Sequence, residues 1–164
     1  YKSSYCIRRH TKYQVGKMRK IFGIGLSRTG TKSLATALQI LGYETLHYCP
    51  LINNGDAVSL DDIKKYDAII STKFYGIYST LDLQYPYSKF ILTTRDMEHW
   101  FSSISKYSDR WNKGDLEKHE GEVKTYFENR DNLLCLDTGQ KDAWSYLCNF
   151  LSRTVPQISF PHIK

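Results

Sequence analysis

A glycine-containing segment near the start of the sequence has the side chains of an anion-binding loop. Residues 25–33 read Gly-Leu-Ser-Arg-Thr-Gly-Thr-Lys-Ser, which brings two glycines together with the cations of Arg28 and Lys32. Backbone N–H groups in such a loop, and the positive end of a helix that follows it, hold phosphate groups. An ordinary strand-to-helix turn is the plainer alternative, but it needs neither cations nor hydroxyls. We therefore predict phosphate binding here, with hydroxyl donors from Thr29, Thr31 and Ser33.

The loop departs from the Walker A pattern of ATP-binding proteins. That pattern, G-x-x-x-x-G-K-[ST], has its lysine directly after the second glycine, whereas Thr31 separates Gly30 from Lys32. One additional helical residue rotates the side chain by about 100°, away from the β- and γ-phosphates. A carboxylate for Mg²⁺ would be sought in Asp137, which follows the apolar run 133–136. An ATP-dependent kinase or NTPase is therefore the alternative interpretation, not the leading one.

Strand and helix patterns alternate around this loop. An apolar run at 20–26 predicts the strand before it. Leucines and alanines at helical spacing from Thr31 to Gly42 predict the helix after it, with the glycine as C-terminal cap. Further strands are expected at 43–48, 67–72, 90–94 and 133–136. Further helices are expected at 60–66, through 81, from 96 to 104, within 108–132 and at 140–151.

This alternation predicts a single-domain α/β fold with three layers, in which helices cover both faces of a mostly parallel sheet of about five strands. We expect residues 1–19 to be a basic extension and residues 20–164 to form the domain. In open sheets of this kind, ligands bind at the carboxyl ends of the strands. The segments expected to meet at that edge are residues 27–32, His47, residues 71–73 and Arg95.

Composition and charge exclude several classes of protein. The chain has 164 residues, of which 41% are hydrophobic and 24% charged, as in ordinary globular domains. No apolar run reaches the roughly 20 residues that cross a bilayer. The net charge is +6, but residues 1–20 alone carry +7, so the basic excess is expected to be a solvated tail and not a nucleic-acid-binding face. We expect a soluble, cytoplasmic protein, with a lumenal fragment of a longer protein as the alternative.

The cysteines and histidines do not predict a metal site. The four cysteines form no C-x-x-C pair, and the five histidines show no ligand spacing. Cys135 and Cys148 lie in apolar stretches, so we expect both to be core thiols of a protein in a reducing compartment.

Three segments together resemble the sulfotransferases that use 3′-phosphoadenosine 5′-phosphosulfate (PAPS). Residues 27–34, Ser-Arg-Thr-Gly-Thr-Lys-Ser-Leu, look like the family's 5′-phosphosulfate loop. Residues 90–103 hold a strand that ends in arginine and a helix with serine eight residues later, and they resemble the family's 3′-phosphate segment. Residues 143–162 are similar to the closing segment of a branch found in bacteria and some eukaryotes. The resemblance covers about residues 20–163.

The resemblance implies a P-loop nucleotide-kinase-like fold and transfer of a sulfuryl group from PAPS to an acceptor hydroxyl or amine, which leaves 3′-phosphoadenosine 5′-phosphate (PAP). Such in-line transfer needs fixed positive charge and hydrogen-bond donors, and the family uses no metal for it. Arg28 takes the place of the family's catalytic lysine, while Arg95 and Ser103 would bind the 3′-phosphate. The implied ligands of the 5′-phosphate are Thr29, Gly30, Thr31, Lys32 and Ser33.

His47 is the candidate general base. An acceptor hydroxyl needs a base that works near pH 7, which histidine supplies. His47 ends the second predicted strand, and the similar branch has a histidine at the matching position. A strand-terminal histidine bound to backbone is the plainer alternative, and His99 is the second candidate for the base.

The acceptor is the least defined partner. Where the similar branch has Asp and then Pro, this chain reads Ser71-Thr72-Lys73, so Lys73 is a candidate contact for an anionic acceptor or for the sulfuryl group. A tyrosine cluster could line an aromatic pocket, although packing roles suit most of its members. We expect a small-molecule or glycan acceptor and no nucleic acid, and we expect related proteins to continue beyond Lys164. A non-catalytic PAP-binding interaction module is a third interpretation. The tyrosines of the cluster are Tyr75, Tyr78, Tyr85 and Tyr87.

Overall fold

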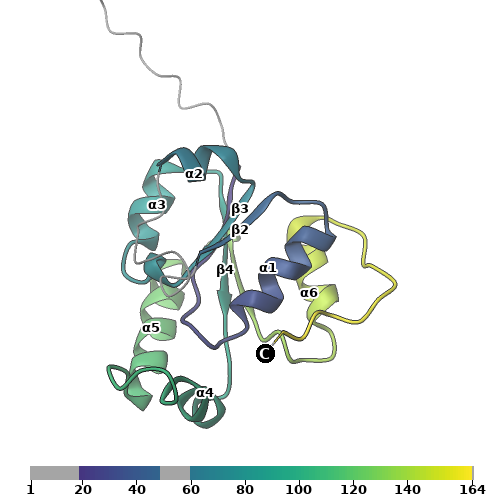
Figure 1. Cartoon of the computed structure of the whole chain (residues 1–164). Coiled ribbons are helices and arrows are strands. Elements are labelled where there is room, and N and C mark those ends of the chain that lie inside the picture. Colours follow the sequence, from purple (N-terminus) through teal and green to yellow (C-terminus); the bar gives the residue numbers. More distant parts are fainter. Residues whose placement is uncertain (1–18, 49–59, 164) are drawn as a thin grey trace, which may run out of the picture.

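The fold is a five-stranded parallel sheet with helices on both faces (Figure 1). The computed structural model describes residues 19–48 and 60–163. The strands lie in the order β2-β3-β1-β4-β5, and every pair is parallel. This confirms the predicted α/β fold with a parallel sheet. The strands are β1 (Ile21–Gly23), β2 (Thr45–Tyr48), β3 (Ala68–Ser71), β4 (Lys89–Thr93) and β5 (Leu133–Leu136).

The helices make the two outer layers. Helices α1 and α6 lie on one side of the sheet, and α2, α3 and α5 lie on the other (Figure 1). Two apolar clusters hold these layers, one around Leu38 and Leu147 and the other around Phe22 and Phe90. Among the described residues, no helix is long and apolar enough to cross a membrane. The helices are α1 (Thr31–Ile40), α2 (Leu60–Lys65), α3 (Tyr78–Gln84), α4 (Met97–Ile104), α5 (Lys113–Tyr126) and α6 (Ala143–Leu151).

Helix α5 is longer than the sequence pattern indicated. Within 108–132 the pattern predicted only some helix, but α5 has 14 residues. Its start is fixed by a capping box, in which Asn112 and Asp115 each bind the other's backbone. It buries Leu116, His119 and Val123, which are spaced three and four residues apart on one side of the helix. The remaining positions are mostly charged and exposed, which is why the periodic signal of the helix was weak.

The expectation that both cysteines are core thiols is wrong for Cys135. Cys148 is buried on α6, but Cys135 is exposed. Strand β5 is an edge strand of the sheet, so one of its sides has no neighbouring strand. The position of β5 at the edge of the sheet therefore accounts for the exposure of Cys135.

Lys20 belongs to the folded domain, although it was counted with the basic lead. It is buried, and its Nζ donates to the carbonyls of Tyr66 and Lys64 at 2.6 and 3.2 Å. Burial lowers the pKa of the Lys20 ammonium, although Asp67 opposes this effect. The ammonium thus satisfies carbonyls at the end of α2. Residues 1–18 of the basic lead lie outside the described residues.

Candidate functional site

The glycine loop connects β1 to α1 at the carboxyl edge of the sheet. Two residues in it have positive φ, Arg28 at 71° and Gly30 at 103°. Gly30 is the N-cap of α1, and no described side chain caps this helix end. The N–H groups of the first turn therefore keep their capacity to bind an anion.

Close packing fixes the shape of the loop. A Cβ on Gly25 would lie 2.0 Å from Thr93 Oγ1, and a Cβ on Gly30 would lie 2.1 Å from Thr138 Oγ1. The Thr29 hydroxyl lies 2.6 Å from that of Thr93 and donates to the Leu26 carbonyl at 2.7 Å. The ends of β4 and β5 thus press directly against the loop. Sequence reasoning missed Thr93 and Thr138, because only the folded sheet brings them to residues 25–30.

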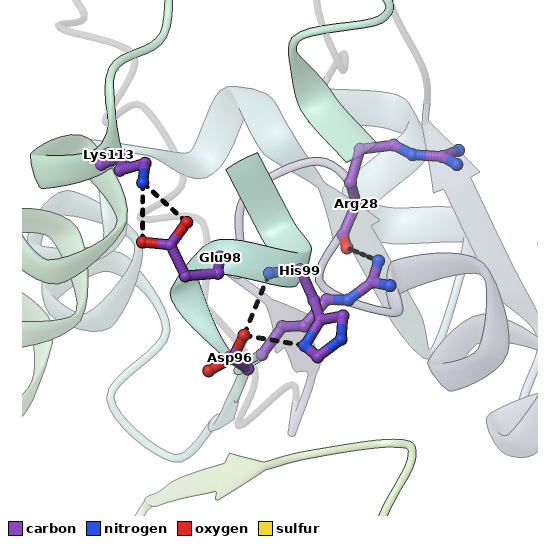
Figure 2. Close-up of polar contacts among 6 residues, drawn as sticks. Arg28, Asp96, Glu98, His99 and Lys113 are labelled. Carbon is purple, nitrogen blue, oxygen red and sulfur yellow. Dashed lines mark hydrogen bonds and ion pairs between the residues drawn. The ribbon is translucent and has the colours of Figure 1, made fainter. Parts of the chain in front are cut away.

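The predicted ligands of the two phosphates lie next to each other. Arg28 Nε donates to Ser103 Oγ at 2.9 Å, and its guanidinium carbon lies 4.7 Å from the centre of the Tyr107 ring. Arg95 donates from Nη1 to the Arg28 carbonyl at 3.0 Å, a bond drawn in Figure 2. Three predicted site residues, Arg28, Arg95 and Ser103, are therefore joined by hydrogen bonds.

His47, on strand β2, contacts the start of the helix that follows the loop. Its Nε2 is 3.2 Å from Thr31 Oγ1 on α1. Burial lowers the pKa of His47, and the positive charge of Lys32 lowers it further. The imidazole is therefore neutral at pH 7, as a general base must be.

The two remaining loop candidates differ in exposure. Lys32 is exposed on the first turn of α1. Ser33 is buried, and its Oγ accepts a hydrogen bond from the N–H of Ile163 at 3.0 Å. The end of the described chain thus packs against the start of α1.

Comparison with known proteins identifies the family. A family profile described as a sulfotransferase domain matches residues 20–116 and 105–164, which together span nearly all of the described chain. The chain belongs to the sulfotransferase family. Ava biosynthesis cluster protein M from Aspergillus versicolor is 24% identical to this sulfotransferase over 211 aligned positions, which cover 88% of this chain and 80% of the relative.

A kinase of known structure has a similar fold. A gluconokinase from Sinorhizobium meliloti superposes with a TM-score of 0.50 and 14% identity, over 84% of this chain and 94% of the kinase. This likeness establishes the P-loop kinase-like fold, as predicted.

The second candidate base, His99, bonds through one ring nitrogen to the carboxylate at the start of α4. Its side chain is 78% exposed, and Nδ1 lies 2.8 Å from Asp96 Oδ1 (Figure 2). Asp96 also accepts the His99 N–H as the N-cap of α4, and this bond is the main cause of the lowered pKa of the Asp96 carboxyl. Nearby, Glu98 pairs with Lys113 at 2.6 Å and joins α4 to α5. His99 thus serves the start of a helix.

The segment after β3 lies at the same edge of the sheet. Ser71 is buried and its hydroxyl accepts the Lys73 N–H, while the Lys73 ammonium lies 5.8 Å from the centre of the Tyr48 ring. In the tyrosine cluster, Tyr75 is exposed on this edge, and Tyr78 packs against the core. Tyr85 also packs against the core, and Tyr87 is exposed beside β4.

Asp137, the candidate Mg²⁺ ligand of the kinase interpretation, caps its own turn. Its Oδ1 accepts the Gly139 N–H at 2.8 Å. Across residues 19–48 and 60–163, no group of three or more His, Cys, Asp or Glu side chains is placed to hold a metal ion.

Sequence reasoning also missed His119 on α5. It is fully buried, and its Nε2 lies 2.8 Å from the carbonyl oxygen of Ile24, directly before the loop. The one available signal was its helical spacing from Leu116 and Val123, which shows burial but not the partner.

Proposed function

We propose that this member of the family is a PAPS-dependent sulfotransferase that moves a sulfuryl group in line to a hydroxyl or amine of a small molecule or glycan. The observation that supports this most directly is the meeting of Arg28, Arg95 and Ser103 beside the start of α1. A donor with a 5′-phosphosulfate and a 3′-phosphate needs two neighbouring anion sites on one edge of the sheet. A nucleotide without a 3′-phosphate would leave the second of these anion sites empty.

The residues present fit PAPS. The loop offers N–H groups at an uncapped helix start, and the absence of Cβ atoms at Gly25 and Gly30 lets it pack closely against β4 and β5. Three cations, Arg28, Lys32 and Arg95, complement the phosphates and the sulfuryl group. Gly30, Thr31, Lys32 and Ser33 would hold the 5′-phosphate, while Thr29, whose hydroxyl donates to the Leu26 carbonyl, would shape the loop. Arg95 with Ser103 would hold the 3′-phosphate.

Two side chains would carry the chemistry. PAPS, when bound, supplies the sulfuryl group. The Arg28 guanidinium would stabilise the negative charge that develops on the transferred group and the leaving oxygen. His47 would take the acceptor's proton. In the tautomer that donates Nε2–H to Thr31, the free lone pair for that proton is on Nδ1.

The first test is a calorimetric titration with PAP, adenosine 5′-phosphate and ATP with Mg²⁺. PAP is expected to bind in the micromolar range and ATP not to bind. Arg95→Ala should weaken PAP binding by about 10- to 100-fold, because a charged hydrogen bond contributes about 1.5–3 kcal/mol. It should weaken adenosine 5′-phosphate binding less, because there only the hydrogen bond to the Arg28 carbonyl is lost.

The matched control for charge is Arg110→Ala, since this exposed arginine lies over the Trp111 ring and has no bond to the loop among the described contacts. Equal losses for PAP and adenosine 5′-phosphate would remove Arg95 from the 3′-phosphate site. Binding of ATP with Mg²⁺ and indifference to the 3′-phosphate would replace the proposal with a kinase or NTPase. Binding of PAP without turnover on a broad acceptor panel would indicate an interaction module.

The pH dependence of turnover tests His47. Because burial and Lys32 lower the pKa of His47 below 6.5, the base form is complete by neutral pH and is lost as the pH falls through that lowered pKa. We expect kcat/KM to rise with pH below 6.5 and to be level at pH 7–8. His47→Gln should lower turnover by about 10²- to 10⁴-fold and remove the acidic limb, with PAP affinity nearly unchanged. His99→Gln is the control, and a His47→Gln enzyme with an intact rate and limb would place the base elsewhere.

A further inference from the structure

The carbonyl groups of the loop are held by side chains from outside it. The Ser27 carbonyl accepts from Trp100 Nε1 at 2.9 Å, and the Ile24 carbonyl from His119 Nε2 at 2.8 Å. The Arg28 carbonyl accepts from Arg95 in the same way. In a planar trans peptide the C=O and the N–H of the next residue point in opposite directions. Each side chain that fixes a carbonyl therefore also fixes the direction of one loop N–H.

Trp100 connects the loop to α4. Its side chain is fully buried and packs with Leu26 and Leu116, while its ring lies 6.2 Å from that of Trp111. The indole has a single N–H donor, and a buried donor needs a partner. This donor is used on Ser27, 73 residues away in the sequence. Since α4 also carries Ser103, this bond joins the loop to the helix of the second proposed phosphate site.

His119, which lies on α5, bonds the backbone at the other end of the loop, directly before Gly25. Because Nε2 carries the hydrogen that is donated to the Ile24 carbonyl, the buried Nδ1 carries none. This Nδ1 has no hydrogen-bond partner among the described residues. The ring packs against those of Tyr75 and Tyr78, with centres 5.0 and 6.2 Å apart. A side chain needed only for packing could be wholly apolar. The imidazole instead presents one N–H to the last carbonyl before the glycine loop.

We propose that Trp100 and His119 are positioning residues of the phosphate loop, which turn the carbonyls of Ser27 and Ile24 toward α4 and α5 and thereby orient the N–H groups of Arg28 and Gly25. This proposal rests on the proposed function, because it assumes that the loop binds the phosphosulfate end of the donor. It adds that the binding geometry is set by two helices, α4 and α5, which share an apolar cluster with the loop residue Leu26.

The test of Trp100 has a matched control in the same chain. Trp144 on α6 is also buried, and its Nε1 donates to a backbone carbonyl at the same 2.9 Å, but this carbonyl belongs to Ile158 and not to the loop. Trp100→Phe and Trp144→Phe remove the same N–H and similar volume. We expect comparable losses of thermal stability, but a roughly tenfold weaker affinity in Trp100→Phe alone. That loss should be similar for PAP and adenosine 5′-phosphate, because both use the loop.

His119 is tested by rescue. His119→Leu removes the donor, whereas His119→Gln returns an N–H at a similar distance from the backbone. We expect weaker PAP binding in the Leu variant and recovery of most of that affinity in the Gln variant.

Three outcomes would overturn the positioning roles. They are wild-type affinity in Trp100→Phe, equal affinity losses in Trp100→Phe and Trp144→Phe, and no difference between His119→Leu and His119→Gln. The wild-type titration separates this from the proposed function. If the wild-type chain binds ATP in place of PAP, the proposed function fails, and the same variants are then compared with ATP as the probe.

Discussion

Replacing Arg28 with alanine is expected to lower the turnover of sulfuryl transfer by about 10²- to 10³-fold, the usual effect of removing one fixed donor from a developing charge. Arg28 lies in the loop between β1 and α1, contacts Ser103 through Nε and has its carbonyl held by Arg95. No neutral side chain supplies the same fixed charge. Turnover is measured with saturating PAPS, so that the loss reports on the transfer step and not on donor binding.

The positive φ of Arg28 requires a second substitution. A φ of 71° is costly for most L residues but tolerated by asparagine. Arg28→Asn removes the charge without adding backbone strain, so it should lose turnover as Arg28→Ala does while keeping more of the unfolding free energy. Arg110→Ala again controls for loss of an arginine that lies over an aromatic ring. Turnover within threefold of wild type in Arg28→Asn would contradict the catalytic role.

Gly30→Ala is expected to abolish measurable PAP binding and to lower the free energy of unfolding by about 2–4 kcal/mol. Two costs combine here. A φ of 103° is unfavourable for any residue with a Cβ, and that Cβ would lie 2.1 Å from Thr138 Oγ1. Either the N-cap of α1 or the turn after β5 must move. Both movements disturb the N–H groups proposed to hold the 5′-phosphate.

Gly42 provides the control for the Gly30 substitution. It also has a positive φ, 87°, but a Cβ there would meet nothing within 4 Å. Gly42→Ala therefore reports backbone strain alone, and the difference between the two variants in denaturant unfolding reports the clash with Thr138. Thr138→Ala should recover part of the stability of Gly30→Ala by removing the nearest atom, Oγ1, together with Cγ2. Equal losses in Gly30→Ala and Gly42→Ala would mean that the packing against Thr138 has no effect.

The order of strands and helices along the chain could be predicted from the sequence, because short apolar runs and leucine spacing are local signals. The run at 133–136 coincides with β5, and the run at 20–26 contains β1, although β1 ends at Gly23, two residues before the loop. Sheet order is not a local property. The exposure of Cys135 on an edge strand and the contact of Thr138 with Gly30 both follow from it, and neither could be predicted.

The candidate site was predicted in parts. Local composition identified the loop, and the resemblance singled out Arg95 and Ser103, but spacing could not show that both contact Arg28. The contact of His119 with Ile24 could not be predicted, since the two residues are 95 positions apart and His119 lies in a helix whose exposed face is mostly charged. A charged helix with few buried positions gives a weak periodic signal, and its buried histidine shows its purpose only through a tertiary contact.

The hydrogen bond from Ile163 to Ser33 makes the end of the described chain a reporter on the loop. It joins residues 130 positions apart, and Ser33 lies on the first turn of α1. The chemical shift and deuterium exchange of this one amide therefore register changes at the start of α1. A single ¹⁵N label at Ile163 would follow occupancy of the loop by a spectroscopic signal, without touching any side chain proposed to act in transfer.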